Sequence, residues 1–322
     1  MMNINEINHI GVLGAGLMGH GIAQVFARAG FNVSIFDADA AALAKVKDRV
    51  AANFDVFIRL NLAGAQDREN CLANITAAQD MQNFCNGPQL IIEAISENIS
   101  VKKTVYAEIE KHAPPDTILT SNTSALSITE ISEALKFKTR FLGTHFWNPP
   151  HIIPCVEIIK GASTDDEIFE TVYALMEKAG KVPVRVLKDI PGFLGNRLQH
   201  AMMREAISLR ENNIASAEDI DKVVKYSFGI RLPFIGPLET ADLAGLDLLQ
   251  NIQQYLFPYL ESSAEPSPLL TALVARRATG VKAGEGFYNW TPEKIGDMIQ
   301  KRDTVLLRII NEIIGDVKSD QR

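Results

Sequence analysis

A run of closely spaced glycines near the start of the chain is the feature that most restricts its fold. The run reads Gly14, Ala15, Gly16, Leu17, Met18 and Gly19. It follows an apolar segment, 9–13, that predicts a strand, and it opens a helical pattern over 18–29. Gly14 would make a tight turn, Gly16 would let a pyrophosphate approach the backbone, and Gly19 would let helix and strand pack closely. Because the helix N-terminus also attracts anions, the segment predicts a dinucleotide-binding unit.

An acidic residue follows the second predicted strand. The apolar segment 31–36 ends at Asp37, where a carboxylate accepts hydrogen bonds from ribose hydroxyls and repels a 2′-phosphate. We therefore expect NAD rather than NADP as the cofactor. FAD shares this fingerprint, but the rest of the chain favours a nicotinamide. The alternative is a glycine-rich loop beside a surface aspartate, with no ligand.

The first half of the chain alternates strand-like and helix-like patterns. Further apolar runs predict strands at 90–94, 117–120, 140–144, 156–159 and 183–186. Amphipathic patterns predict a long helix over 40–60 and another over 101–111. This alternation predicts parallel βαβ units, and therefore a doubly wound α/β Rossmann domain.

The pattern changes after a break with turn residues at 188–192. Helical periodicity dominates from there on, and it predicts a helix over 197–210. A second helix would begin after an N-cap at Ser216, and a last helix would have Pro292 at its first position. A short segment at 287–288 is the one remaining β-type pattern. We predict an NAD-binding Rossmann domain over 1–188 and an all-α substrate and dimerisation domain over 189–322.

Composition narrows the class of protein. A length of 322 residues suits two domains, and a formal net charge of −7 without Lys/Arg clusters argues against a nucleic-acid partner. The start of the chain lacks a signal-peptide pattern, and no apolar run reaches the roughly 18 residues of a membrane span. Three scattered cysteines favour reduced thiols over disulfides or a zinc site. We expect a soluble, cytoplasmic protein with no metal and no membrane partner.

Polar residues gather between 121 and 157. The segment 121–124 follows a predicted strand, at the carboxyl edge where doubly wound sheets bind ligands, and His145 follows another. Glu157 lies inside an apolar run and needs a partner if it is buried. Paired with Glu157, His145 would be held in one tautomer and made more basic. It would then suit a general base that takes a hydroxyl proton while hydride leaves for NAD. A lone histidine with a structural role is the alternative.

Five sequence blocks resemble those of one enzyme family. The blocks are GAGLMG, SNTSALSIT, GTHFWNPP, VEII and PGFLGNRL, in this order. They resemble blocks of the 3-hydroxyacyl-CoA dehydrogenases, and the resemblance extends from His9 to about Tyr288. The resemblance implies NAD as cofactor and oxidation of a 3-hydroxyl to a ketone by hydride transfer.

The resemblance also implies roles for single residues. His145 would be the general base and Glu157 its partner, while Ser124 and Asn196 would contact the substrate oxygen and the base. The cofactor would be bound by Gly14, Gly16, Leu17, Met18, Gly19, Asp37, Glu97, Lys102, Asn148 and Lys282. Of these, Asn148 would lie at the nicotinamide, and Lys282 would come near the cofactor when the domains close.

The order Ser124, His145, Glu157 also allows a Ser-His-Glu hydrolase. Ser124 is not in a GxSxG turn, however, and a hydrolase has no use for a dinucleotide fingerprint.

The substrate is less constrained than the reaction. The only basic residue of 50–64 is Arg59, and Leu60 occupies a position where the family has a lysine, although a polyanionic CoA tail favours several cations. The segment 229–237 and a last helix from Glu293 to about Ile314 resemble a subgroup that acts on free acids. That subgroup includes L-gulonate 3-dehydrogenase and a pyridine-carboxylate dehydrogenase.

In that subgroup reading, Arg231 would clamp a substrate carboxylate with two parallel hydrogen bonds. A solvated surface arginine is the alternative, and His151 is better explained by a structural role. We expect a small free hydroxy or formyl carboxylic acid as substrate, slightly ahead of a 3-hydroxyacyl-CoA of fatty acid metabolism.

A catalytically idle, crystallin-like structural protein is the alternative from another class. The intact set of four polar residues argues against it: Ser124, His145, Glu157 and Asn196. Apolar helix faces in the second half predict a homodimer, unless they form the core of the monomer. They include Leu246, Leu248, Leu249 and Ile252.

Overall fold

The computed structural model describes residues 4–320, with side chains described as far as Glu312. By contacts between residues the chain divides into two compact units, one ending at Arg197 and the other beginning at Leu198. Each unit is described by itself. The domain boundary that we place at residue 189 stays a prediction.

A twisted sheet forms the centre of the first unit, and its strands in the described part of the chain run in the order β3-β2-β1-β4-β5-β6-β7-β8. The strands are β1 (His9–Leu13), β2 (Asn32–Phe36), β3 (Ile75–Ala77), β4 (Leu90–Glu93), β5 (Ile118–Ser121), β6 (Phe141–Phe146), β7 (Cys155–Ile159) and β8 (Val182–Val186). The order reverses direction between β1 and β4, which makes the carboxyl ends of these two strands the switch point where such sheets bind ligands.

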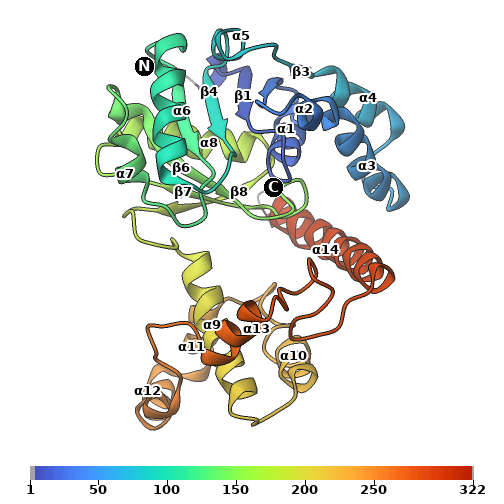
Figure 1. Ribbon diagram of the computed structural model, residues 1–322, viewed down its shortest axis with the longest axis vertical. Helices are drawn as coiled ribbons and strands as arrows, with labels where there is room; N and C mark the ends of the chain where they lie inside the picture. The colour runs from blue at the N-terminus through green and yellow to red at the C-terminus, as the bar shows by residue number, and fades with distance from the viewer. Residues whose placement is uncertain (1–3, 321–322) are drawn as a thin grey trace. The chain divides into compact units, whose positions relative to one another are not determined.

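Helices cover both faces of this sheet (Figure 1). They are α1 (Gly19–Arg28), α2 (Ala40–Ala44), α3 (Val46–Arg59), α4 (Ala65–Ala73), α5 (Met81–Cys85), α6 (Ile99–His112), α7 (Ile128–Ser132) and α8 (Asp166–Lys178). Alternate strand residues feed two separate apolar cores, as the period of two along a strand requires. Ile10 and Val12 of β1 pack with α1, α3, α4 and α8, whereas Leu13 packs with α5, α6 and α7. Burial on both faces explains the nearly continuous apolar strand sequences.

The direction of two strands differs from the sequence prediction. Strands β1 to β6 are parallel to their neighbours, but β7 runs antiparallel to β6, and β8 is parallel to β7. The expectation of parallel βαβ units throughout is therefore wrong for β7. The reason lies in the connection from Phe146 to Cys155, which contains no helix, whereas a parallel crossover needs a dozen or more residues and usually a helix.

Two smaller differences concern segment 40–77. The single helix predicted over 40–60 is two helices, α2 and α3, which meet at Lys45. Asp39 caps α2, its side chain accepting a hydrogen bond from the backbone N–H of Ala41. Strand β3 was not predicted, because it has three residues of which only Ile75 is buried, too few for a periodic pattern.

The second unit is helical, as predicted. It contains most of α9 (Gly195–Glu211), then α10 (Ala217–Tyr226), α11 (Pro237–Ala244), α12 (Leu246–Leu256), α13 (Pro268–Ala275) and α14 (Pro292–Asp320). The predicted cap is confirmed, since Ser216 Oγ accepts from the N–H of Asp219. Thr291, directly before Pro292, caps α14 in the same way, and its Oγ1 accepts from the N–H of Lys294. The β-type pattern at 287–288 forms no strand, and the segment is held by isolated bridges of Glu285 with Gly280 and Asn289.

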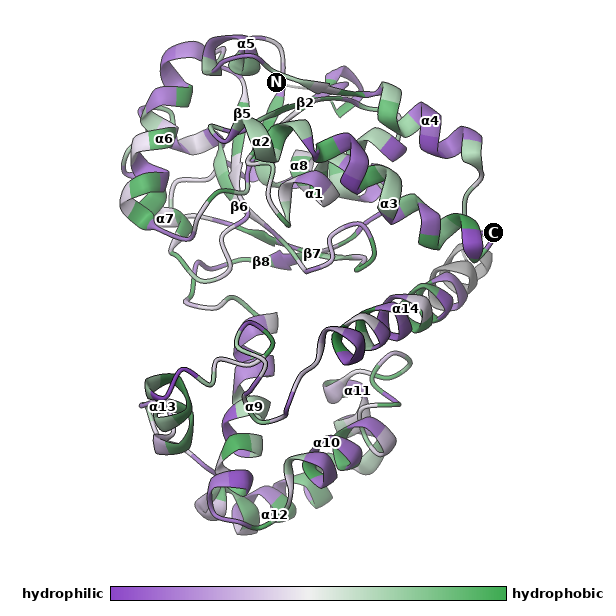
Figure 2. Ribbon diagram, turned by 45° about the vertical axis from the view of Figure 1, so that its right-hand side comes forward, coloured by the Kyte–Doolittle hydropathy of each residue, from purple (hydrophilic) through white to green (hydrophobic). Residues whose placement is uncertain are grey.

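The helices of the second unit carry both polar and apolar side chains, seen as alternating colours along α10, α12 and α14 in Figure 2. Among its side chains up to Glu312, the only buried apolar ones are Leu273, Ala278 and Leu307. Large apolar side chains such as Tyr226, Phe234 and Leu238 are exposed. Within residues 4–320 no helix has the length and apolar character to cross a membrane.

Candidate active site

The glycine run forms the turn between β1 and α1, and each position favours glycine for a different structural reason. Gly14 has a φ of +105°, and a Cβ there would lie 2.5 Å from the carbonyl oxygen of Ala94. A Cβ at Gly19 would collide with the carbonyl oxygen of Gly14, so α1 can approach β1 closely only with glycine there. At Gly16, by contrast, a Cβ would meet no atom within 4 Å, which leaves room for a ligand.

The N-terminus of α1 faces this open space without a side-chain cap. Met18 is the N-cap residue and makes no side-chain cap hydrogen bond, and the side chain of Leu17 is exposed. A helix N-terminus without a cap keeps N–H groups available for an anion such as a pyrophosphate.

Asp37 follows β2 and is tied to the glycine turn. Its Oδ2 accepts a 2.6 Å hydrogen bond from the N–H of Ala15, and its Oδ1 accepts one of 2.8 Å from the N–H of Asp39. Arg49 of α3, which the sequence analysis did not single out, donates to the carbonyl oxygen of Ala15 at 2.9 Å. A carboxylate with two oxygens has further acceptor sites for ribose hydroxyls. The turn, the open helix end and this carboxylate together fit a dinucleotide.

His145 and Glu157 face each other across the antiparallel strands β6 and β7. They are direct partners in the register of the two strands, and both are buried. His145 Nδ1 lies 2.7 Å from Glu157 Oε2. Directly opposite residues have Cβ atoms about 5 Å apart, which is the spacing this side-chain hydrogen bond needs.

The second oxygen of Glu157 is fixed by backbone groups. Oε1 accepts hydrogen bonds from the N–H groups of Leu194 at 2.9 Å and Gly195 at 3.0 Å, where α9 begins. Burial alone would raise the pKa of Glu157, but the hydrogen bonds from His145, Gly195 and Leu194 outweigh burial and hold that pKa below its ordinary value. The carboxylate is therefore charged, and it keeps the histidine in one orientation.

Two aromatic rings surround His145. The ring centroids of Trp147 and Phe193 lie 5.1 Å and 5.8 Å from that of His145. Phe193 is fully buried and has a φ of +51°, in the left-handed region that costs a non-glycine residue roughly 1 kcal/mol. That backbone conformation places the Phe193 ring on the histidine directly before the two N–H groups that hold Glu157.

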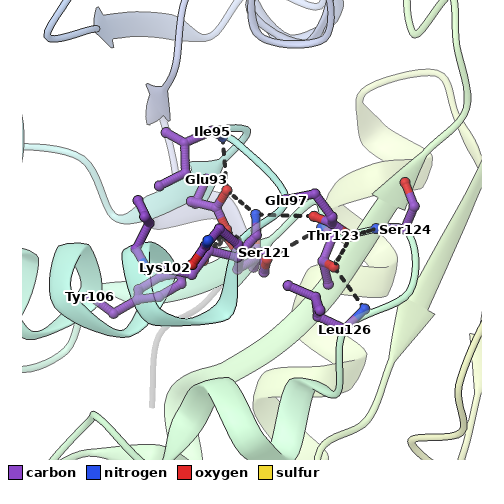
Figure 3. Close-up of polar contacts among 12 residues, drawn as sticks. Glu93, Ile95, Glu97, Lys102, Tyr106, Ser121, Thr123, Ser124 and Leu126 are labelled. Atoms are coloured by element: carbon purple, nitrogen blue, oxygen red, sulfur yellow. Dashed lines mark hydrogen bonds and ion pairs between the residues drawn. The ribbon is translucent and has the colours of Figure 1, made fainter. Parts of the chain in front are cut away.

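The loop after β5 is anchored by Glu97 (Figure 3). Glu97 Oε1 accepts hydrogen bonds from Thr123 Oγ1 at 2.5 Å, the N–H of Ser124 at 2.9 Å and the N–H of Ala125 at 3.3 Å. Asn196 Nδ2 donates to the carbonyl oxygen of Ser124 at 2.8 Å. Since Asn196 follows Gly195, this bond joins the Ser124 loop to the segment that holds Glu157.

Beneath this loop lies a second buried carboxylate, Glu93, at the end of β4 (Figure 3). It accepts hydrogen bonds from Lys102 Nζ at 2.5 Å, Ser121 Oγ at 2.7 Å and the N–H of Ile95 at 2.8 Å. Tyr106 OH lies 3.3 Å away, and burial together with the Glu93 charge raises the pKa of Tyr106 well above its ordinary value.

Lys102, which the family resemblance places with Glu97 on the cofactor side, is a buried neighbour of Glu97. It is 1% exposed, and its Nζ lies between Glu93 and Glu97, 3.5 Å from Glu97 Oε2. The side chain of Glu97 is 43% exposed and is the accessible member of this group. The sequence analysis missed Glu93, although it lies in an apolar run, LIIEA, just as Glu157 does in its own run. The same argument, that a buried carboxylate needs partners, would have found it.

The remaining predicted residues lie in the loop after β6 and in the second unit. Asn148 is exposed in the loop after β6, and His151 packs against Phe57 of α3 with ring centroids 6.2 Å apart, which agrees with a structural role. Arg231 and Lys282 belong to the second unit, where both are exposed. Among the described side chains, no group of three or more His, Cys, Asp or Glu residues is arranged to hold a metal ion.

Comparison with known proteins identifies both parts of the chain. Residues 9–190 match the NAD binding domain of 3-hydroxyacyl-CoA dehydrogenase, and residues 192–290 match its C-terminal domain. The chain is 32% identical over 303 residues to 5-formyl-3-hydroxy-2-methylpyridine 4-carboxylate 5-dehydrogenase of Mesorhizobium japonicum, covering 94% of this chain and 97% of the relative.

Two solved structures extend the comparison. A crystal structure of 5-formyl-3-hydroxy-2-methylpyridine 4-carboxylic acid 5-dehydrogenase, described as an NAD+ dependent dismutase, superposes with a TM-score of 0.89 at 32% identity, covering 96% of this chain and 99% of that one. The (S)-3-hydroxybutyryl-CoA dehydrogenase PaaH1 of Ralstonia eutropha superposes with a TM-score of 0.74 at 34% identity, covering 88% and 99%. The chain therefore belongs to the 3-hydroxyacyl-CoA dehydrogenase family of NAD-dependent dehydrogenases.

Proposed function

We propose that this dehydrogenase oxidises the hydroxyl-bearing carbon of a small free hydroxy or formyl carboxylic acid, with His145 as the general base. The observation that carries the proposal is the buried pair of His145 and Glu157, with Nδ1 and Oε2 2.7 Å apart. NAD supplies the acceptor for the hydride that leaves the substrate carbon.

The tautomer of His145 follows from its partner. A charged Glu157 only accepts hydrogen bonds, so Nδ1 carries the proton and Nε2 keeps a lone pair. Nε2 then takes the hydroxyl proton of the substrate, and the adjacent carboxylate stabilises the imidazolium that forms. Because Oε1 is held by the N–H groups of Leu194 and Gly195, Glu157 stays in place while the charge on the histidine changes.

Ser124 and Asn196 orient the substrate oxygen in this proposal. The Ser124 hydroxyl is exposed, while its backbone is fixed on both sides by Glu97 and Asn196. The side-chain amide of Asn196 has two N–H donors, and one of them is used in the hydrogen bond to the carbonyl oxygen of Ser124. A second donor therefore remains for the substrate oxygen or for the base.

The proposed cofactor site comprises the glycine turn, further residues of the first unit and one lysine of the second unit. We assign to it Gly14, Gly16, Leu17, Met18, Gly19, Asp37, Glu97, Lys102, Asn148 and Lys282. Because Lys102 is buried, we assign it an indirect role, in which its ammonium orients the accessible Glu97 carboxylate. Asn148 is exposed and near His145 in sequence, which suits a contact with the nicotinamide.

The free acid is favoured over a thioester by the scarcity of cations over 50–64, which comprises the later part of α3 and the segment that follows. Arg59 is the only basic residue of 50–64, which offers little to the phosphates of CoA. The match to the pyridine-carboxylate dehydrogenase also covers 96% of this chain, against 88% for the hydroxybutyryl-CoA dehydrogenase. We propose Arg231 as the residue that binds the substrate carboxylate. A 3-hydroxyacyl-CoA is the second candidate, since family relatives carry that name.

We also propose that the protein is a cytoplasmic homodimer that pairs through its second unit. The support is the large set of exposed apolar side chains there, since exposed apolar patches of this extent mark interfaces. The cysteines Cys71, Cys85 and Cys155 are all free, which suits a reducing compartment.

The test compares two substrates and two arginine variants. Reduction of NAD is followed at 340 nm with free L-gulonate and with 3-hydroxybutyryl-CoA, for the wild type, Arg231→Ala and Arg210→Ala. Arg210 is the control, because it is also an arginine of the second unit and its Nη1 donates to Asn213 Oδ1 near the end of α9. We expect turnover of the free acid that falls at least about tenfold in Arg231→Ala, as for the loss of a charged hydrogen-bonded pair, and not in Arg210→Ala.

Strong turnover of the thioester that Arg231→Ala leaves unchanged would instead support the second candidate. Whichever of the two substrate candidates is right, we expect His145→Gln to lose all activity with either substrate. Turnover that survives in His145→Gln would contradict the assignment of the base.

A further inference from the structure

Lys181 is a buried cation that the proposed reaction does not use. It directly precedes β8 and is 9% exposed. Its Nζ donates hydrogen bonds to the carbonyl oxygens of Pro150 at 2.5 Å and Ile153 at 2.7 Å, and it lies 5.9 Å from the centre of the Phe146 ring. Both acceptors belong to the loop that connects β6 to β7.

This loop is held from the other side by the helices of the cofactor domain. A Cβ at Gly21 of α1 would come within 2.6 Å of the Pro150 ring, so the proline packs directly on that helix. The His151 ring packs on Phe57 of α3. Within the loop, the N–H groups of Ile152 and Ile153 both bond to the carbonyl oxygen of Pro149. The turn is therefore packed on α1 and α3, and the Lys181 ammonium holds its carbonyl groups.

The cost of placing a lysine here is evident from its surroundings. Among the described residues Lys181 forms no salt bridge, and its polar partners are the two neutral carbonyl groups. Burial lowers the pKa of Lys181 to about 7; the charge that Cys155 can carry opposes this shift, and the positive charge of Arg28 adds to it. An apolar side chain of similar size would avoid this desolvation. What the lysine provides that an apolar residue would not is two directed N–H bonds to the loop.

We propose that Lys181 is a positioning residue, whose two hydrogen bonds fix the 147–153 loop so that Asn148 meets the cofactor beside His145. The inference rests on the proposed function, which places Asn148 at the nicotinamide. The loop starts two residues after His145 and ends before β7, which carries Glu157.

The chain supplies its own reporter for this loop. Its two tryptophans are Trp147, inside the loop, and Trp290, in the second unit. In a Trp290→Phe background, tryptophan emission excited at wavelengths that tyrosine does not absorb comes from Trp147 alone. Emission and acrylamide quenching then report the loop without any substrate, and titration with NAD gives the cofactor dissociation constant.

The test compares Lys181→Met with Lys178→Met in that background. Methionine keeps the length of the side chain and removes every N–H donor. Lys178 is an exposed lysine three positions earlier, and its Nζ lies 5.3 Å from the centre of the Phe31 ring. We expect Lys181→Met to increase acrylamide quenching of Trp147 and to weaken NAD binding about tenfold, the loss expected for two hydrogen bonds. We expect Lys178→Met to match the parent.

Lys181→Gln separates positioning from folding, because glutamine keeps N–H donors and carries no charge. It should restore part of the NAD affinity lost in Lys181→Met. If Lys181→Met lowers only the melting temperature, and leaves Trp147 quenching and the NAD dissociation constant at the parent values, the inference is overturned. If the parent protein itself fails to bind NAD, the proposed function fails instead, and the two failures are thereby distinguished.

Discussion

At the level of single residues, two buried carboxylates hold the side chains and loops of the candidate site in place. Glu157 and Glu93 are both in β-strands, both buried, and both surrounded by donors: His145, Leu194 and Gly195 for the first, and Lys102, Ser121 and Ile95 for the second. A buried charge without such partners would be strongly destabilising. Each carboxylate therefore fixes the groups around it, and through them the loops that carry Ser124 and Asn196.

Glu157→Gln tests this role. The N–H groups of Leu194 and Gly195 will hold the amide oxygen, so that the amide NH2 faces His145 Nδ1. Nδ1 must then be the unprotonated nitrogen, and the proton moves to Nε2, which can no longer act as a base. We expect kcat to fall by about 10²- to 10⁴-fold, the range for general-base catalysis.

Glu170→Gln is the matched control for this substitution, since Glu170 is an exposed partner of Arg185, outside the site. A Glu157→Gln enzyme whose kcat is within twofold of the wild-type value would contradict the tautomer argument.

The pH dependence of stability gives a second test of the role of Glu157. Because the folded pKa of Glu157 is lowered, its contribution is complete above the unfolded pKa of about 4.3 and is lost as the pH falls through the folded pKa. The stability difference between wild type and variant should shrink in acid.

Sequence reasoning at this scale was uneven. The pairing of His145 with Glu157 was anticipated from a carboxylate inside an apolar run, and the two side chains lie together in the structure. The resemblance implies that Lys102 binds the cofactor, which stays a prediction, and the structure shows its Nζ buried between Glu93 and Glu97. A lysine's position in a motif does not reveal which of two neighbouring carboxylates will bind it, because that depends on how β4 and α6 pack.

At the level of elements, two connections build the site: the glycine turn between β1 and α1, and the antiparallel pair β6 and β7. Local sequence specified the first completely, since turn, strand and helix each have their own pattern within 9–29. The second was missed, because an apolar run predicts a strand without its direction. Direction depends on the connection, and the loop after Phe146 contains no helix to bring β7 back parallel.

Substitutions at Gly19 and Gly16 should separate folding from cofactor binding. An alanine Cβ at Gly19 would collide with the backbone of Gly14, so we expect Gly19→Ala to lower the free energy of unfolding by about 1–3 kcal/mol. Gly16→Ala has open space for its Cβ and should leave stability nearly unchanged, while weakening NAD binding. Thermal unfolding and NAD titration measure the two effects. Equal melting temperatures for both variants would refute the packing argument.

At the level of the whole molecule, the two units differ in how they bury apolar residues. The first has a core on each face of its sheet, whereas the second buries three apolar side chains among those described: Leu273, Ala278 and Leu307. Helices that expose side chains such as Leu238, Leu243 and Tyr255 lack the burial from which most helical stability comes. A second copy of the chain would supply that burial.

We therefore predict a homodimer that persists in high salt. Light scattering at micromolar concentration should give twice the mass of the 35.4 kDa chain, because apolar burial is not screened by ions. Dissociation by salt would indicate an interface held by charges instead. A monomer under both conditions would refute the prediction.

The sequence by itself determined the class of fold, the place of the glycine turn, the switch to helices after about 190 and the pairing of His145 with Glu157. These features follow from local patterns: glycines where backbone atoms approach, apolar residues at the period of their element, and a charged residue among apolar neighbours. Only the tertiary structure decided the direction of β7, the burial of Lys102 against Glu93, and the use of Lys181 under the loop. Those depend on contacts between segments far apart in the chain, such as Lys102 with Glu93 and Lys181 with Pro150, and no local pattern records which distant groups will meet in the folded protein.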